Sequence, residues 1–206
     1  MDNQQIIPFK KIVILGPEST GKSSLCKELA LHYSTQWVPE YAREYLLTNG
    51  NVYTFENLLD VAKGQIALEE SSIHEMEQLT KALLNNEERS KNKSLSSATE
   101  LITAPPLFID TDMYVLKVWC EFVFDKCHHW ILNQVVERKY DLYLLCDIDL
   151  PWVKDELREY PDYETREKLY HYYKDIMVNQ RIPWVSISGN YQQRLQTAIE
   201  AVDTIL

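Results

Sequence analysis

The stretch that decides the fold of this chain lies near its start and reads Gly16-Pro17-Glu18-Ser19-Thr20-Gly21-Lys22-Ser23-Ser24. An apolar run at 12–15 precedes it, and a run typical of a helix, 25–30, follows it. The stretch matches G-x-x-x-x-G-K-[ST], a pattern that works between a buried strand and a helix because loop N–H groups and the helix N-terminus then converge on one anion. The nine residues are therefore predicted to bind the phosphates of ATP.

Two side chains of this stretch have predicted chemical roles. Lys22 is expected to reach the β- and γ-phosphates and to act in catalysis. The Ser23 hydroxyl is expected to be a ligand of Mg²⁺. ATP and Mg²⁺ are thus the predicted cofactors.

Length and charge narrow the class of protein. The 206 residues fit a single domain, 1–206, and 45% of them are hydrophobic, as in ordinary globular chains. The net charge of −10 argues against nucleic acid as a partner. No signal peptide or apolar run of 18 residues is apparent, so we expect a cytoplasmic protein that does not interact with membranes.

Cysteine and histidine spacing does not predict a zinc site. Cys127-His128-His129 is the only local cluster, and no C-x-x-C or H-x-x-x-H pair accompanies it. The four cysteines are expected to be reduced thiols in the core of a cytosolic protein.

Short apolar runs alternate with helical patterns along the chain, which predicts an α/β fold with a parallel sheet. The predicted strands are 12–15, 36–38, 107–109, 142–146 and 184–187. Two later helices carry apolar stripes that we interpret as core, namely Leu169, Tyr172, Tyr173, Ile176 and Met177, and then Leu195, Ala198, Ile199 and Val202.

A long helical pattern covers residues 55–84 and is followed by a polar stretch. Gly64 lies within the pattern and indicates a kink or a close approach, because glycine is unfavourable inside a helix. Residues 85–100 are serine-rich and lack apolar anchors, so they are predicted to form a mobile surface insertion.

Polar residues that follow the second strand are candidates for substrate binding. Glu40, Tyr41 and Arg43 come directly after it, where α/β sheets bind ligands. A helix starting near Glu40 would put Glu40 and Arg43 on one face. The alternative is an ordinary surface pair at a helix start.

The third predicted strand ends in a carboxylate, Asp110, and Asp112 follows two residues later. Asp110 is the better candidate for organising magnesium beside the phosphate loop and for a catalytic role. Asp112 is predicted to contact the substrate. Either residue could instead cap the helix that follows.

The charged segment 149–166, after the fourth strand, is predicted to be a lid that closes over the triphosphate. Arg158 is its candidate for contact with the transferring phosphoryl group, and Arg166 is a weaker one. A surface loop with ordinary salt bridges is the alternative.

Four segments together resemble one family. They are GPESTGKS (16–23), WVPEYAREY (37–45), FIDTD (108–112) and LLCDIDLPWVKDELR (144–158), and in order and spacing they resemble the ribosylnicotinamide kinase domain of NadR-type proteins. The resemblance covers nearly the whole chain except the polar insertion. It implies a P-loop NTPase three-layer sandwich, nucleoside-kinase-like, with a five-stranded parallel sheet of order 2-3-1-4-5.

The resemblance also implies an activity, the transfer of the ATP γ-phosphate to the ribose 5′-hydroxyl of nicotinamide riboside. Glu40 and Arg43 would then face the riboside, with Asp110 and Asp112 between acceptor and metal. Glu40 is our choice of base and Asp110 its rival. Glu40, Tyr41 and Trp37 would favour the cationic nicotinamide ring.

The chain departs from the family in two respects. Val115 and Leu116 stand where family members often carry hydroxyl residues. The adenylyltransferase site of the multidomain relatives has no counterpart, so we expect a kinase only, with a partner enzyme to complete NAD synthesis. The alternatives are a kinase for another nucleoside or nucleotide and a nucleotide-dependent switch, although a guanine-reading N-K-x-D motif is absent.

Overall fold

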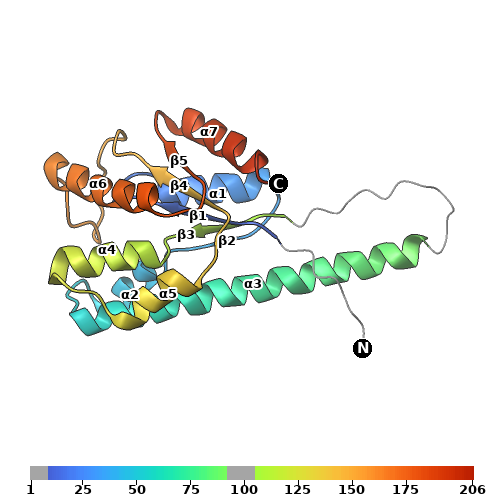
Figure 1. Ribbon diagram of the computed structural model, residues 1–206, viewed down its shortest axis with the longest axis horizontal. Coiled ribbons are helices and arrows are strands. Elements are labelled where there is room, and N and C mark those ends of the chain that lie inside the picture. The colour runs from blue at the N-terminus through green and yellow to red at the C-terminus, as the bar shows by residue number, and fades with distance from the viewer. Residues whose placement is uncertain (1–8, 92–104) are drawn as a thin grey trace.

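The computed structural model describes residues 9–91 and 105–206 (Figure 1). Its single sheet contains β1 (Lys11–Leu15), β2 (Trp37–Val38), β3 (Leu107–Asp110), β4 (Leu142–Cys146) and β5 (Trp184–Ile187). All neighbouring strands are parallel, and the order β2-β3-β1-β4-β5 confirms the predicted 2-3-1-4-5 arrangement. Each predicted strand is present, and β3 extends one residue further, to include Asp110.

Helices cover both faces of the sheet (Figure 1). They are α1 (Lys22–His32), α2 (Tyr41–Asn49), α3 (Phe55–Lys91), α4 (Met113–Phe124), α5 (His129–Glu137), α6 (Tyr163–Asn179) and α7 (Tyr191–Asp203). Successive strand residues point to opposite faces. In β1, Ile12 and Ile14 pack with α1 and α7, whereas Val13 and Leu15 pack with α4 and α6.

The predicted apolar stripes lie mostly where expected. In α7, Ala198 and Val202 are buried, and in α6 Leu169, Tyr173 and Met177 are buried. Tyr172 was predicted in the same stripe, and this is wrong, because its side chain points outward and is 44% exposed. The buried stripe of α6 is therefore narrower than the predicted one, because one side of this helix faces solvent.

One hydrophobic cluster covers each face of the sheet, and a third cluster lies away from the sheet, among α2, α3, α4 and α5. Leu58, Val61 and Ala62 of α3 contribute to it, as do Leu116 and Cys120 of α4. All four cysteines of the chain are free thiols, and three are buried. This cluster packs α2, α3, α4 and α5 against one another.

Helix α3 runs further than its apolar pattern indicates. It continues to Lys91, so the first part of the predicted insertion 85–100 is helical, and the rest of that insertion lies outside the described residues. Figure 1 shows its C-terminal part extending beyond the sheet. Glu69 interrupts the apolar stripe yet is buried, because it accepts a hydrogen bond from Tyr140 (2.9 Å) and pairs with Arg138 (3.1 Å).

In the part of the chain that the structure describes, no helix is both long enough and apolar enough to cross a membrane.

Gly64 marks a close approach, one of the two possibilities that the sequence left open. A Cβ added to Gly64 would lie 2.0 Å from Cε1 of Tyr41, far inside van der Waals contact. The glycine thus allows the first turn of α2 to lie directly on α3. The position of α2 matters because Glu40 immediately precedes it.

Replacement of Gly64 by alanine is expected to lower the melting temperature by several degrees. Alanine favours a helix by about 1 kcal/mol over glycine, but overpacking against the Tyr41 ring costs about 1–3 kcal/mol and should dominate. Thermal unfolding followed by circular dichroism measures the change. In a Tyr41→Ala background the ring is gone, so Gly64→Ala should there be neutral or stabilising. A higher melting temperature for the single variant would contradict the contact.

Candidate active site

The loop between β1 and α1 has the backbone that the motif requires. Gly16 and Gly21 adopt φ values of 138° and 80°, which residues with a Cβ rarely adopt. A Cβ on Gly16 would lie 2.7 Å from the carbonyl oxygen of Cys146. Gly21 is the N-cap of α1 and supplies no side-chain cap, so the first N–H groups of α1 are left for an anion.

Side chains of the loop brace it from within. The Thr20 hydroxyl donates to the carbonyl oxygen of Pro17 at 2.8 Å, and Lys22 Nζ donates to the same oxygen at 2.9 Å. The ammonium group of Lys22 therefore lies over the loop, where a phosphate would meet it.

A cavity of about 240 Å³ opens beside the loop. All nine predicted ATP-binding residues line it. Three further residues predicted from the sequence, Glu40, Arg43 and Arg158, line it as well. Its other walls are largely apolar and aromatic and comprise Ala42, Leu46, Val115, Val118, Trp119, Phe122, Leu157, Glu159, Tyr160, Leu169 and Tyr173.

Glu40 is held in place through the residues on either side of it. The Tyr41 N–H donates to Gln65 Oε1 at 2.7 Å, and Gln65 Nε2 donates to the carbonyl of Pro39 at 3.2 Å. Gln65 is a buried residue of α3. The Glu40 side chain itself forms no cap on α2, so its carboxylate remains available to the cavity.

Asp110 is fully buried at the end of β3. Neither of its carboxylate oxygens accepts a hydrogen bond from any residue that the structure describes. The pKa of this carboxyl rises from 3.8 to about 7, chiefly because of burial and secondly because of the Glu40 carboxylate, while Lys22 and the nearby Ser23 hydroxyl act in the opposite direction. Two buried oxygens without partners fit a site that a cation would complete.

Asp112 lies in a different setting. It is the N-cap of α4, and its side chain accepts hydrogen bonds from the N–H groups of Tyr114 (3.0 Å) and Val115 (3.4 Å). The Tyr143 hydroxyl donates to its other oxygen at 3.2 Å. Burial raises the pKa of this carboxyl to about 7. Asp110, Asp112 and Tyr41 are not among the residues that line the cavity.

The segment predicted as a lid lies over the phosphate loop and is bound to its side chains. Glu18 accepts hydrogen bonds from the N–H groups of Glu159 (3.0 Å) and Tyr160 (2.5 Å). The Ser19 hydroxyl accepts from the N–H of Val153 at 2.9 Å and from Arg158 at 3.3 Å. The Arg158 guanidinium therefore lies at the rim of the loop.

The segment predicted as a lid is irregular only as far as residue 162, short of the predicted boundary of 166. Helix α6 begins at Tyr163, with Asp162 as its N-cap, so 163–166 are helical. Arg166 is buried in the first turn and donates to the carbonyl oxygens of Ile148 and Leu150, both at 3.4 Å. It thus contacts the start of the lid.

Arg43 joins α2 to the lid. Its guanidinium forms two hydrogen bonds with the Asp155 carboxylate, at 3.2 and 3.0 Å. The pair raises the pKa of Arg43 and lowers that of Asp155. Glu40, the surface partner that the sequence suggested, raises the pKa of Arg43 less than Asp155 does. Arg43 therefore links α2 to the segment predicted as a lid, rather than pairing with Glu40.

Several residues in or beside the cavity were not predicted from the sequence. Gln65 lies in helix α3 and belongs to no motif, and the aromatic residues that line the cavity belong to helices and to the segment predicted as a lid. Trp37, which was expected near the nicotinamide ring, does not line the cavity; Lys27 Nζ lies 5.4 Å from its ring centroid. Val115 does line the cavity, whereas Leu116 packs in the third cluster.

Comparison with known proteins agrees with this geometry. A family model described as an AAA domain matches residues 11–194. The chain is 24% identical over 201 residues to the trifunctional NAD biosynthesis/regulator protein NadR of Escherichia coli, and 23% identical over 205 residues to its Salmonella typhimurium counterpart. These matches span 96% and 98% of this chain but only 43% and 44% of those proteins.

Two solved structures share the fold. The crystal structure of NadR protein in complex with NR superimposes with a TM-score of 0.68 at 19% identity, over 96% of this chain and 50% of that one. NadR in complex with NAD and AMP-PNP gives a TM-score of 0.63 at 18% identity, over 96% and 49%. The resemblance to NadR-type proteins inferred from four segments is thereby confirmed.

Removal of the Asp110 charge is expected to stabilise the protein when nucleotide and magnesium are absent. Between pH 4 and 7 the folded carboxyl keeps a proton that the unfolded chain has released, so this group lowers stability as the pH rises through that range. Asp110→Asn should therefore melt about 3 °C or more above the parent at pH 8, with a smaller gain at pH 5. Thermal unfolding at both values measures it.

Asp60→Asn, which alters an exposed carboxylate of α3, is the matched control and should shift little at either pH. A lower melting temperature for Asp110→Asn at pH 8 would contradict the burial of an uncompensated charge.

Proposed function

The chain belongs to the AAA domain family, and from that premise we propose that it is a kinase that transfers the γ-phosphoryl group of ATP to the ribose 5′-hydroxyl of nicotinamide riboside. The observation that carries the proposal is that one cavity is lined by the phosphate loop, by aromatic side chains and by the carboxylate residue Glu40. A donor and an acceptor bound in it would meet beside Lys22 and Glu40.

The donor end supplies positive charge and N–H groups to a triphosphate. Lys22 and the first turn of α1 face the β- and γ-phosphates, and Arg158 approaches from the lid. Asp110 and the Ser23 hydroxyl are oxygen donors suited to Mg²⁺, and the unpartnered oxygens of Asp110 support this fit. Magnesium held there would neutralise charge on the phosphate oxygens.

The acceptor end suits a flat cationic ring. Trp119, Phe122, Tyr160 and Tyr173 line it, and the carboxylate of Glu40 adds negative charge. Aromatic faces and carboxylates both attract cations, so both would favour binding of the positively charged nicotinamide ring of the riboside. The similarity to NadR, whose structure is known with NR, supports the same acceptor.

Glu40 is our choice for the base that accepts the 5′-hydroxyl proton. Glu40 lines the cavity. Hydrogen bonds with Gln65 hold the backbone on both sides of Glu40, at Pro39 and Tyr41. Asp110 is fully buried and is not among the residues that line the cavity, which suits a metal ligand better than a base in contact with the riboside. The role of Asp110 is therefore assigned to the donor end.

A panel of acceptors tests the proposal. At one set of conditions, kcat/KM for nicotinamide riboside should exceed that for uridine, cytidine and thymidine by about tenfold or more, which is about 1.4 kcal/mol of transition-state preference. A coupled assay of ADP release measures all four. A neutral nucleoside preferred by the same factor would replace the riboside as acceptor and leave the kinase chemistry intact.

Two variants act as controls in that assay. Lys22→Ala should lower kcat about a hundredfold or more with every acceptor, because it removes a preorganised charge at the phosphates. Glu40→Gln should lower kcat on the preferred acceptor while the affinity for AMP-PNP changes little. An active Glu40→Gln variant beside an inactive Asp110→Asn variant would transfer the base role to Asp110.

A further inference from the structure

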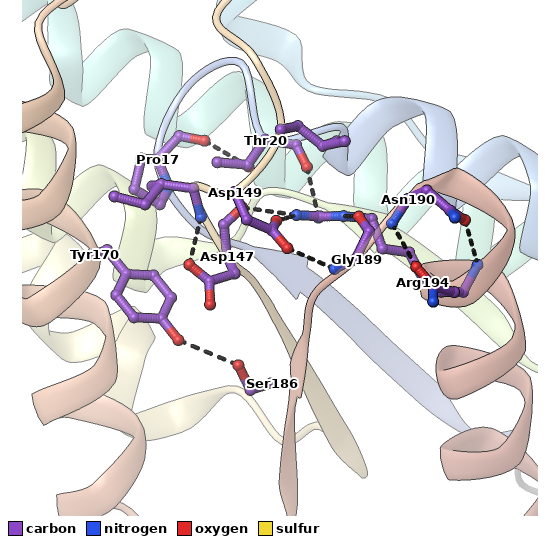
Figure 2. A network of polar contacts seen from close by, with 12 residues as sticks. Pro17, Thr20, Asp147, Asp149, Tyr170, Ser186, Gly189, Asn190 and Arg194 are labelled. Atoms are coloured by element: carbon purple, nitrogen blue, oxygen red, sulfur yellow. Dashed lines mark hydrogen bonds and ion pairs between the residues drawn. The ribbon is translucent and has the colours of Figure 1, made fainter.

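Arg194, in the first turns of α7, is a charged side chain that is only 3% exposed. Its guanidinium donates hydrogen bonds to the carbonyl oxygens of Gly189 (2.8 Å), Thr20 (3.0 Å) and Asp147 (3.0 Å), and it pairs with the carboxylate of Asp149. Figure 2 shows these bonds converging on one side chain. Three separate segments of the chain thus meet at Arg194: the phosphate loop, the segment after β4 and the loop after β5.

The bond to Thr20 has a consequence for the phosphate loop. The peptide between Thr20 and Gly21 is planar and trans, so its carbonyl and its N–H point in opposite directions. Because the carbonyl points toward Arg194, the N–H of Gly21 points away from Arg194, and Gly21 itself lines the cavity. In loops of this kind, such an N–H is a donor to the phosphates.

Because residue 21 is glycine, the orientation of the Thr20–Gly21 peptide needs a restraint such as the hydrogen bond from Arg194. Its φ of 80° lies in a region where glycine has wide freedom, and the peptide preceding it could rotate. Within the loop, the Thr20 hydroxyl bonds to Pro17, but this contact does not hold the Thr20 carbonyl. Arg194 supplies that missing restraint from outside the loop.

The loop after β5 is held by hydrogen bonds of its own, and these also hold the residues that Arg194 contacts. The Gly189 N–H donates to the Asp149 carboxylate at 2.5 Å. Asn190 and Gln193 form a capping box at the start of α7. Asp149 also compensates the charge of Arg194, so the geometry of the guanidinium should matter more than its net charge.

We propose that Arg194 is a positioning residue of the donor site, which holds the Thr20–Gly21 peptide so that the Gly21 N–H faces the triphosphate. The proposal rests on the proposed function only in that the loop binds a nucleoside triphosphate. Its effect is expected to fall on nucleotide affinity and to leave acceptor binding unchanged, because Thr20 of the phosphate loop is the one partner of Arg194 that lines the cavity.

Nucleotide binding and steady-state kinetics of Arg194→Met test this proposal. Loss of the guanidinium should weaken AMP-PNP binding, measured by calorimetry on folded protein, about tenfold or more. KM for ATP should rise accordingly, whereas KM for the acceptor should stay within about twofold of the parent. Arg181→Met, which removes an exposed arginine before β5, is the matched control and should leave all three constants unchanged.

Unchanged AMP-PNP affinity in folded Arg194→Met would overturn the proposal, and so would an equal rise in both KM values, which a merely structural role predicts. If Arg194→Met does not fold, Arg194→Lys is judged by the same criteria, because lysine keeps the charge but cannot reach three carbonyls together. AMP-PNP binding requires no acceptor, so the result stands even if nicotinamide riboside is not the substrate.

Discussion

The N–H groups at the start of α1 need an acceptor that the chain does not provide, and much of the molecule is arranged around that requirement. Gly21 caps the helix without a side chain, and the two left-handed glycines turn the backbone so that the loop closes on an anion. Contacts from distant segments then hold the loop in shape. Arg194 binds its backbone, and Glu18 and Ser19 bind the lid above it.

The same logic of uncompensated groups extends to two carboxylates near the loop, Asp110 and Glu40. Asp110 is buried with no hydrogen-bond partner among the described residues, a costly arrangement that is typical of a functional position. Glu40 keeps a free carboxylate because Gln65, from another helix, satisfies the backbone around it. The helices α2 and α3 approach closely enough for this only because residue 64 is glycine.

Local patterns were sufficient for much of the fold. The strands were predictable because each is a short apolar run between helical patterns, and the phosphate loop because its spacing is fixed by phosphate geometry. The resemblance to NadR-type proteins added the strand order. Glu40, Arg43 and Arg158 were expected near the loop since they follow carboxyl ends of strands, and all three line the cavity.

What escaped prediction depends on contacts between distant parts of the chain. Arg43 could be placed on a helix, but its partner Asp155 depends on the path of the lid. Arg194 and Gln65 look like ordinary polar residues of amphipathic helices until the fold brings backbone carbonyls to them. Trp119 and Phe122 match a core pattern, and only the packing of α4 shows that they face the cavity.

The fate of the γ-phosphate distinguishes phosphoryl transfer to the riboside from hydrolysis of the nucleotide. The protein is incubated with ATP labelled at that position, with and without nicotinamide riboside, and the label is counted in nicotinamide mononucleotide and in inorganic phosphate. The account predicts one labelled mononucleotide for each ADP formed and little ADP without the riboside. Equal ADP formation in both reactions, with the label in inorganic phosphate, would contradict the account and indicate a nucleotide-hydrolysing switch.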